Sequence, residues 1–374
     1  MIYFDNAATS YPKPKSTLTA LRNCIKSSLG NPSRSSHFLS RSAGEAVYTV
    51  REKVADIFSL SDPENVVFTL NATHSLNMAI KAFVTEKCHI IISDAEHNSV
   101  VRPIYRLCEK LGVELSEYDF EKDPHEAIIP LIRNDTVGII STIVSNVTGH
   151  RGNLAALSSI AEKYGLFLII DASQAAGHTL INLDSTPCDV LCAPAHKSLL
   201  GIPGAGIAIF KSKKRAETIL EGGSGTNSID KHMPILLPEG YEAGTLPTPS
   251  ICALGGGLDF IKKIGVLEIE DKINRLTHAA YEMLSDIQGM KIYGASVGIV
   301  SFNLCEYNSL FLSSLLDDQK ICTRGGLHCS PSVHKKLGTT ETGAVRLSFS
   351  YFNSENEIYK LYKILRAIKT NNQI

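Results

Sequence analysis

The sequence predicts an α/β protein whose mostly parallel sheet is followed by a smaller α+β lobe. Through the first two-thirds of the chain, short β-branched runs alternate with longer amphipathic stretches. Apolar strands that alternate with helices are typical of a parallel sheet covered on both faces. After about residue 250 this alternation gives way to strands and helices in mixed order, and 374 residues leave room for a large domain and a smaller one.

Each element is expected where its local pattern supports it. Short apolar runs predict strands at residues 66–70, 89–93, 137–144, 167–171, 190–192 and 206–210. Apolar side chains at helical spacing predict helices at 75–84, 100–111 and 154–164. In the smaller lobe we expect a long helix from 250 towards 284, strands at 300–304, near 321 and at 344–351, and helices at 309–316 and 355–369. Three consecutive glycines at 255–257 indicate that the long helix packs closely on another element.

The composition excludes several classes of protein. Hydrophobic residues make up 44% and charged residues 20%, as in a folded soluble protein. The net charge of -1 argues against a nucleic-acid binder, and no apolar run approaches the roughly 18 residues that span a bilayer. The N-terminus lacks the pattern of a signal peptide, and nine scattered cysteines form no CxxC pair. We therefore expect a cytoplasmic protein with free thiols, about seven or eight of the nine buried, and neither a nucleic acid nor a membrane as partner.

The strongest chemical signal is Asp171 together with Lys197. Glycine-rich motifs for NAD or ATP are absent. Asp171 ends an apolar strand, where a parallel sheet opens into its ligand crevice, and Lys197 follows the next short strand. Pyridoxal phosphate requires this pair, because a lysine amine binds its aldehyde and a carboxylate keeps its ring nitrogen protonated.

These residues lie in the stretches DASQ and AHKS, and here the chain resembles the fold-type I pyridoxal-phosphate enzymes of aminotransferase class V. Within that class it is similar to cysteine desulfurases and selenocysteine lyases. The resemblance extends from FDNAAT at residues 4–9 to AVRLSF at 344–349. It implies a cofactor-binding large domain at 15–255 with a mostly parallel seven-stranded sheet. The small domain then comprises 1–14 and 256–374.

The resemblance also assigns the residues that contact pyridoxal 5'-phosphate. Thr73 and His74 match phosphate ligands of the family. They lie in a strand-to-helix turn whose free backbone N–H groups could bind a phosphate. The same turn could simply cap the helix, and the two interpretations are compatible. His97 matches the histidine that stacks on the cofactor ring and can shuttle protons, and Asn146 matches a residue near a cofactor oxygen and the substrate carboxylate. Gln174 matches the residue that bonds the phenolic oxygen of the cofactor, and His196 matches a phosphate ligand.

One position departs from the family pattern. The phosphate-binding serine usual three residues before the lysine is replaced by Pro194, which has neither a hydroxyl nor an N–H. The resemblance assigns Thr245 to the phosphate of a neighbouring subunit, which implies a two-fold homodimer with shared active sites.

Substrate binding is assigned to Arg346, with Asn146, His37 and Arg324. A guanidinium such as that of Arg346 can hold a substrate carboxylate through two parallel hydrogen bonds. The residues alone allow another interpretation, an arginine on a strand face in a surface ion pair.

Cys329 distinguishes the possible reactions. It lies in TRGGLHCSP, residues 323–331, where glycines, a proline and the lack of periodicity predict a loop and an accessible thiol. Nearby Arg324 and His328 would favour the thiolate. The stretch is similar to the loop that carries the sulfur-accepting cysteine in the second group of cysteine desulfurases. The alternative is that Cys329 is a buried, inert cysteine. The nearby Cys and His residues fit no standard zinc spacing, so we expect no metal site.

Together these features predict a homodimeric, pyridoxal-phosphate-dependent cysteine desulfurase. It would convert L-cysteine to L-alanine, place the sulfur on Cys329 as a persulfide, and pass it to an acceptor protein or thiol. Iron–sulfur clusters, tRNA, another cofactor and selenium metabolism all remain open as destinations. The alternatives are a selenocysteine lyase acting on L-selenocysteine, a class V aminotransferase, and a non-catalytic scaffold.

Overall fold

A computed structural model describes residues 1–374 except 28, 33–34, 212–217, 226–228, 306 and 372–374. Its largest sheet has seven strands in the order β2-β8-β7-β6-β5-β3-β4. Only β8 pairs antiparallel with its neighbours, so the sheet is mostly parallel, as predicted. The strands are β2 (Val66–Thr69), β3 (His89–Ser93), β4 (Glu114–Tyr118), β5 (Thr136–Thr142), β6 (Phe167–Asp171), β7 (Val190–Pro194) and β8 (Gly206–Phe210).

Six of these strands are confirmed predictions, and β4 was missed. The central strands β3, β6, β7 and β8 are buried throughout, which explains their continuous apolar runs. Strand β4 lies at the edge of the sheet, and its sequence ELSEY is mostly polar and partly exposed. Its hydrophobic pattern is therefore too weak to show in the sequence.

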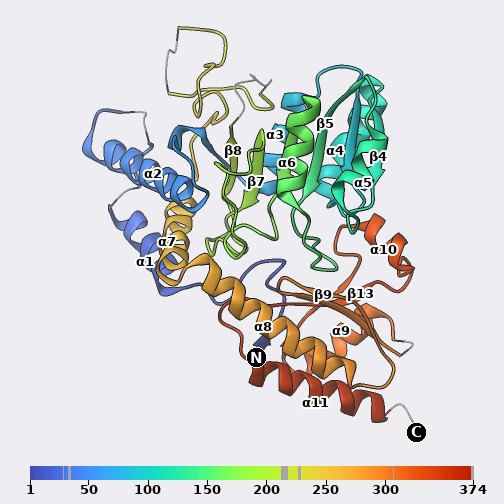
Figure 1. Cartoon of the computed structure of the whole chain (residues 1–374). Coiled ribbons are helices and arrows are strands. Elements are labelled where there is room, and N and C mark those ends of the chain that lie inside the picture. Colours follow the sequence, from blue (N-terminus) through green and yellow to red (C-terminus); the bar gives the residue numbers. More distant parts are fainter. Residues whose placement is uncertain (28, 33–34, 212–217, 226–228, 306, 372–374) are drawn as a thin grey trace.

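Helices cover both faces of this sheet (Figure 1). They are α3 (Ala72–Phe83), α4 (Asn98–Leu111), α5 (Pro124–Ile128) and α6 (Leu154–Tyr164), with short 3-10 turns at Pro63–Asn65 and Ile129–Leu131. Side chains of Asn71, His97 and Asn153 cap the first turns of α3, α4 and α6. The helices α4 and α6 end at Gly112 and Gly165, both left-handed.

The predicted long helix is in fact two helices, α7 (Thr248–Ile264) and α8 (Val266–Ser285). Gly265 separates them with φ of 92°, a backbone conformation that L side chains rarely adopt. The prediction of close packing at the glycine triplet is confirmed. A Cβ on Gly256 would lie 2.4 Å from the carbonyl oxygen of Ser16 in α1 (Lys15–Ser27). The helix α2 (Phe38–Ile57) also packs on α7.

The smaller lobe has a four-stranded antiparallel sheet in the order β12-β13-β10-β9. Its strands are β9 (Met290–Ser296), β10 (Ile299–Leu304), β12 (Arg324–Gly326) and β13 (Ala344–Ser348), and its further helices are α9 (Ser309–Asp318), α10 (Pro331–Leu337) and α11 (Glu355–Asn371). The sequence prediction missed β9 and placed β12 in a loop, because ArgGlyGly carries no strand signal. The last strand ends at Ser348, three residues earlier than predicted.

The N-terminal residues join the two lobes. Strand β1 (Ile2–Tyr3) pairs in parallel with β11 (Ile321–Cys322) of the small lobe. The side chain of Asn6 donates to the carbonyl oxygen of Ser348 at 2.8 Å. The backbone N–H of Ser10 donates to the carbonyl oxygen of His196 at 3.1 Å. This one segment therefore contacts both lobes close to Lys197.

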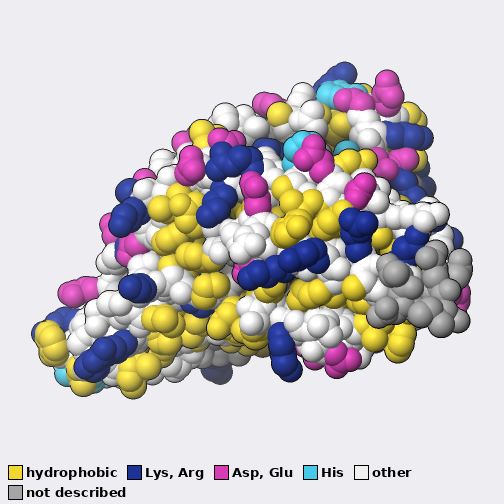
Figure 2. Space-filling view, turned by 90° about the horizontal axis from the view of Figure 1, so that it is seen from below, with side chains coloured by type: hydrophobic (Ala, Val, Ile, Leu, Met, Phe, Trp, Pro, Cys, Tyr) yellow, Lys and Arg dark blue, Asp and Glu magenta, His cyan; other side chains and the backbone are white. Residues whose placement is uncertain are grey.

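The surface seen in Figure 2 carries hydrophobic side chains in several patches among Lys, Arg, Asp and Glu. No helix in the described ranges is long and apolar enough to cross a membrane. Five cysteines are buried, Cys108 and Cys322 are half-buried, and Cys305 and Cys329 are exposed. Fewer thiols are fully buried than predicted.

Candidate active site

A cavity of about 110 Å³ opens beside the C-terminal ends of the parallel strands β5, β6 and β7. Parallel strands place their ligand crevice at this edge. Seven of the predicted cofactor residues line the cavity, although they come from five separate stretches of the chain: Thr73, His97, Asn146, Asp171, Gln174, His196 and Lys197.

Asp171 and Lys197 give this cavity its charge. Asp171 is the last residue of β6 and only 3% exposed, and its Oδ1 accepts a hydrogen bond from the backbone N–H of Ser173 at 2.8 Å. Burial lowers the pKa of the Lys197 amine to about 8, although the negative charge of Asp171 acts in the opposite direction. A much larger fraction of this amine is therefore neutral and nucleophilic near pH 7 than for an exposed lysine.

The backbone around Lys197 is held by the N-terminal segment. The carbonyl oxygen of His196 accepts from the amine of Lys13 at 2.7 Å and from the N–H of Ser10, and the carbonyl of Lys197 accepts from the hydroxyl of Ser10 at 2.8 Å. Sequence reasoning missed Ser10 and Lys13, because nothing in residues 10–13 indicates a contact with residue 196.

Hydrogen bonds to the side chains of Asn71 and His74 fix the turn before α3. Asn71 caps the helix by accepting from the N–H of His74 at 2.9 Å. The ring of His74 accepts at Nδ1 from the N–H of Leu70, and its Nε2 is buried without a partner among the described residues. His74 itself is not among the residues that line the cavity, whereas Thr73 is.

The ring of His97 is fixed in one tautomer by the helix that it caps. The backbone N–H of Ser99 donates to Nδ1 at 3.1 Å, so the neutral ring carries its proton on Nε2. The hydroxyl of Ser99 lies 2.9 Å from the same nitrogen and 2.8 Å from the hydroxyl of Thr73. Burial lowers the pKa of His97, which favours the neutral form. Ser99 is a third residue that the sequence did not reveal, although its place two residues after a capping histidine is a weak signal.

Glu96 is a buried carboxyl next to His97. One of its oxygens accepts from the hydroxyl of Ser93 and, at 2.7 Å, from the N–H of Thr142. Its other oxygen is buried without a partner among the described residues. Burial raises the pKa of Glu96 to about 8, and the charge of Asp171 adds to this effect. Glu96 is therefore mostly protonated at neutral pH.

Arg346 lies in β13 and is 1% exposed, so it is not a surface arginine. Its Nη2 donates to Oδ1 of Asp5 at 3.0 Å, and its Nη1 donates to the backbone oxygen of Asn146 at 3.0 Å. Its Nε is buried and has no partner among the described residues. An unpaired buried guanidinium N–H is costly unless a ligand completes it.

Cys329 lies in a tight turn between β12 and α10. His328 and Cys329 have φ of 52° and 61°, a strained conformation for residues other than glycine. The side chain of Asn146 holds the turn from both sides, since it donates to the carbonyl of His328 at 2.7 Å and accepts from the hydroxyl of Ser330 at 2.7 Å. The thiol is exposed, as predicted.

The turn also contacts the N-terminus of α4, where the N–H of Asn98 donates to the carbonyl oxygen of Cys329 at 2.8 Å. The expectation that His328 supplies positive charge to the thiol is not supported. Burial and the neighbouring charges of Arg346, His334 and Arg324 lower the pKa of His328 to about 2, so its ring is neutral. Its Nε2 lies 3.0 Å from the carbonyl oxygen of Ala344 and serves the fold of the turn.

The cavity lining does not include three further predicted residues, Arg324, His37 and Thr245. Arg324 pairs in register with Arg346 on the adjacent strand, and its charge lowers the pKa of Lys197. His37 is exposed and caps α2. Thr245 is exposed and accepts from the side chain of Asn31 at 3.2 Å. Pro194 ends β7 and lines the cavity without offering a hydrogen bond.

The profile of the aminotransferase class-V family matches residues 2–361, so the chain belongs to this family. Within the family, its relatives are cysteine desulfurases. A probable cysteine desulfurase of Halalkalibacterium halodurans is 28% identical to this chain. The alignment covers 99% of this chain and 93% of that protein. The apo structure of a cysteine desulfurase from Thermococcus onnurineus NA1 superposes with a TM-score of 0.91 at 30% identity, over 98% of this chain and 94% of that one.

Proposed function

We propose that this protein is a pyridoxal-phosphate-dependent cysteine desulfurase that converts L-cysteine to L-alanine and places the sulfur on Cys329. One observation carries the proposal. The cavity that joins Asp171 to Lys197 and the groove that ends at the exposed Cys329 share Thr73, His97 and Ser99 as walls. A substrate held at Lys197 and a thiol at residue 329 can therefore meet across these three side chains.

The residues present fit pyridoxal phosphate, on which enzymes of this family generally depend. Nδ1 of His196 and Nε2 of His74 are buried without partners among the described residues, and both histidines are expected to bind the phosphate. We assign the phosphate to Thr73, His74 and His196, the ring nitrogen to Asp171, and the phenolic oxygen to Gln174. The side-chain amide of Gln174 uses one N–H on the carbonyl oxygen of Ala7, at 3.0 Å, and has a second N–H left.

When bound, the cofactor supplies an aldehyde for the Lys197 amine and a ring that withdraws electrons from the substrate α-carbon. The buried carboxylate of Asp171 holds the ring nitrogen protonated. With a pKa of about 8, the amine of Lys197 can accept and return the α-proton near neutral pH. The neutral ring of His97 presents its Nε2 proton, so it acts as a hydrogen-bond donor towards the cavity.

Arg346 suits the substrate carboxylate. Its unpaired Nε is a buried donor, and Asp5 and the backbone of Asn146 fix the orientation of the guanidinium plane. Two parallel N–H donors of an arginine match the two oxygens of a carboxylate. We therefore assign the amino-acid end of L-cysteine to Arg346 and the thiol end to the side of Cys329.

The reaction balances without an external oxidant. The carbon–sulfur bond of the substrate breaks, a sulfur–sulfur bond forms to Cys329, and the former β-carbon takes a proton to give L-alanine. The sulfur leaves its carbon as an electrophile for the Cys329 thiolate. A thiol acceptor then removes the outer sulfur and restores Cys329.

The test uses pure protein loaded with pyridoxal phosphate and given L-cysteine. We expect alanine to form and the peptide that contains Cys329 to gain the mass of one sulfur. Cys329→Ala should lose at least about 100-fold in alanine formation while keeping the absorption of the bound cofactor. The matched control is Cys305→Ala, which removes the other exposed thiol and should change nothing. Full activity of Cys329→Ala would refute the sulfur chemistry.

The same assay with L-selenocysteine separates a desulfurase from a selenocysteine lyase, because selenium leaves more readily and needs Cys329 less.

We further propose a homodimer in which Thr245 serves the partner's site. We also propose a cytoplasmic location, because the described cysteines are free thiols. Iron–sulfur cluster assembly is a process that consumes sulfur in this form, and we propose it as a destination.

A further inference from the structure

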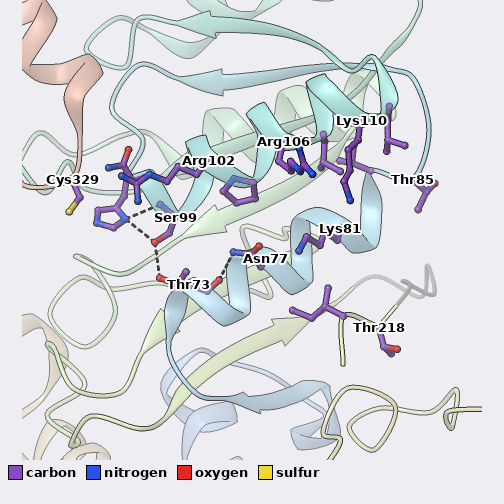
Figure 3. A pocket seen from close by; sticks show the side chains of 17 residues that line it. Thr73, Asn77, Lys81, Thr85, Ser99, Arg102, Arg106, Lys110, Thr218 and Cys329 are labelled. Carbon is purple, nitrogen blue, oxygen red and sulfur yellow. Dashed lines mark hydrogen bonds between the residues drawn. The ribbon is translucent and has the colours of Figure 1, made fainter. Parts of the chain in front are cut away.

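A groove of about 950 Å³ runs from Cys329 along the outer surface of α3 and α4. Cys329 and His97 lie at one end, and Lys110 and Leu111 lie at the other, at the C-terminal end of α4. Figure 3 shows the thiol of Cys329 at one end and a row of long side chains leading away from it. This groove is much larger than the cavity at Lys197 and larger than L-cysteine requires.

The charged side chains among the described residues that line it are all basic. Arg102, Arg106 and Lys110 follow each other every four residues along α4, and Lys81 on α3 faces them (Figure 3). All four are exposed, and no Asp or Glu is among the described residues that line the groove. Neighbouring like charges at this spacing destabilise a helix slightly, so the fold alone gains nothing from them.

Ion pairs do not neutralise this row. Within the part of the chain that the structure describes, only Arg106 has an ion pair, with Glu109 at 3.2 Å on the same helix and both side chains well exposed. Arg102, Lys110 and Lys81 form none there. The floor between them is apolar, with Pro103, Leu107 and Val84, and an apolar floor with a basic rim is typical of a protein-binding surface.

We propose that this groove docks an acidic segment of the protein that takes sulfur from Cys329. The proposal rests on the desulfurase function. The acceptor's thiolate attacks the outer sulfur of the Cys329 persulfide, the sulfur–sulfur bond to Cys329 breaks, and Cys329 leaves as a thiolate. Basic side chains beside the exchange attract the acidic acceptor and stabilise its thiolate.

The experiment uses three synthetic peptides as sulfur acceptors, each with one cysteine and otherwise rich in glutamate, glutamine or lysine. The holoenzyme is given L-cysteine, and peptide persulfide is quantified by mass spectrometry. We expect transfer to the glutamate peptide about tenfold faster than to the glutamine peptide at low salt, and the preference should vanish towards 1 M salt. The lysine peptide should be the slowest.

The variant Arg102→Glu, Arg106→Glu, Lys110→Glu should reverse this order of peptides. Its matched control is Lys263→Glu, Lys360→Glu, Lys363→Glu, which changes the net charge equally on exposed positions of α7 and α11 and should keep the order. Equal rates for all peptides in the wild type, or the same order in the groove variant, would overturn the proposal.

Two controls keep other failures apart. Alanine formation with dithiothreitol as acceptor tests the desulfurase itself, and it should be unchanged in the groove variant. If no variant forms alanine, the proposed function fails rather than the docking surface. Sedimentation of the groove variant tests whether a second copy of the chain covers the groove, and dissociation of a dimer would also overturn the assignment to an acceptor.

Discussion

The amine of Lys197 is buried at the cavity, where the charges of Asp171 and of two arginines act on it. Its pKa of about 8 arises first from desolvation, while Asp171 raises it and Arg346 and Arg324 lower it. The amine is therefore poised to react with an aldehyde at neutral pH. This property belongs to one residue and can be measured without the cofactor.

We predict that Lys197 of the apo-protein reacts with trace acetic anhydride at a rate that levels off near pH 8. Mass spectrometry of the labelled peptides measures this rate. The control in the same sample is the exposed Lys262, whose ion pair with Asp56 raises its pKa, so its rate should keep rising well above pH 8. In Asp171→Asn the plateau should begin at a lower pH, because the carboxylate no longer stabilises the charged amine. Parallel pH profiles for Lys197 and Lys262 would contradict the perturbed environment of Lys197.

Glu96 gives a second prediction, about stability. Its pKa is raised to about 8 in the native state, so between its ordinary value of 4.5 and about 8 the native protein keeps a proton that the unfolded chain has released. The stability of the wild type should therefore fall as pH rises through this window, by about 1.4 kcal/mol per pH unit from this group.

Glu96→Gln keeps the hydrogen-bonding shape without a charge, so the difference in unfolding free energy between variant and wild type should grow from pH 5 to pH 8. Denaturant unfolding of the apo-protein at each pH measures it. Glu341→Gln, at an exposed turn, is the control. A difference that stays constant with pH would mean that Glu96 is ionised in the native state.

Among single residues, sequence reasoning selected those whose type and local context predict a chemical role. Asp171, Lys197 and Cys329 stand out because each has a local context, a strand end or a glycine-rich turn. Ser10, Lys13 and Ser99 were missed because their contacts are with residues distant in sequence or with a helix cap. Their function is to hold other residues, and that leaves no pattern in the chain.

At the scale of elements, α7 shows how a helix can position a site that it does not enter. A Cβ on Gly257 would lie 2.2 Å from the carbonyl oxygen of Leu199 and 2.9 Å from the carbonyl carbon of Leu200, two and three residues after Lys197. These contacts are with backbone, which cannot rotate away. The helix therefore supports the turn that carries the lysine.

Alanine in the middle of a helix normally stabilises it relative to glycine, by up to about 1 kcal/mol. For Gly257→Ala we predict the opposite sign, a loss of at least about 2 kcal/mol in unfolding free energy together with weaker cofactor retention. Gly222→Ala is the control, since its Cβ would meet only Ala243 at 3.8 Å, and it should change stability by less than about 0.5 kcal/mol. A Gly257→Ala protein as stable as the wild type would show that the turn can move.

Elements were predictable where their burial is uniform. The central strands and α4 and α6 have continuous or periodic apolar patterns and clear caps, so their positions were foreseen. The edge strand β4 and the strands β9 and β12 were missed because pairing with a neighbour, rather than their own side chains, makes them strands. The break at Gly265 was missed because the apolar pattern continues through it.

At the scale of the whole molecule, the site draws on both lobes and on the N-terminal segment. Arg346 and Cys329 come from the small lobe, whereas Asp171 ends a strand of the large sheet and Lys197 follows the next strand. Asp5, Asn6 and Ser10 connect them by hydrogen bonds and an ion pair. The proposed homodimer adds a fourth contribution, Thr245 of a second copy.

Mixing two inactive variants tests this sharing. Thr245→Ala and Lys197→Ala homodimers should each be impaired, but after subunits are exchanged the mixed dimer has one site with both an intact Lys197 and an intact Thr245 from the partner. Activity should then recover to about a quarter of the wild type, because half of the dimers are mixed and each has one working site. If Thr245 serves its own chain, mixing restores nothing.

The sequence by itself determined the fold class and the chemistry, because apolar periodicity and the types of the reactive residues are written in local stretches. Only the tertiary structure decided the environment of those residues. It showed that His328 is neutral, that His97 is held in one tautomer, that Arg346 is buried with an unpaired N–H, and that a basic groove leads to Cys329. Protonation, pairing and burial depend on neighbours that come from distant parts of the chain, so they exist only once the chain has folded.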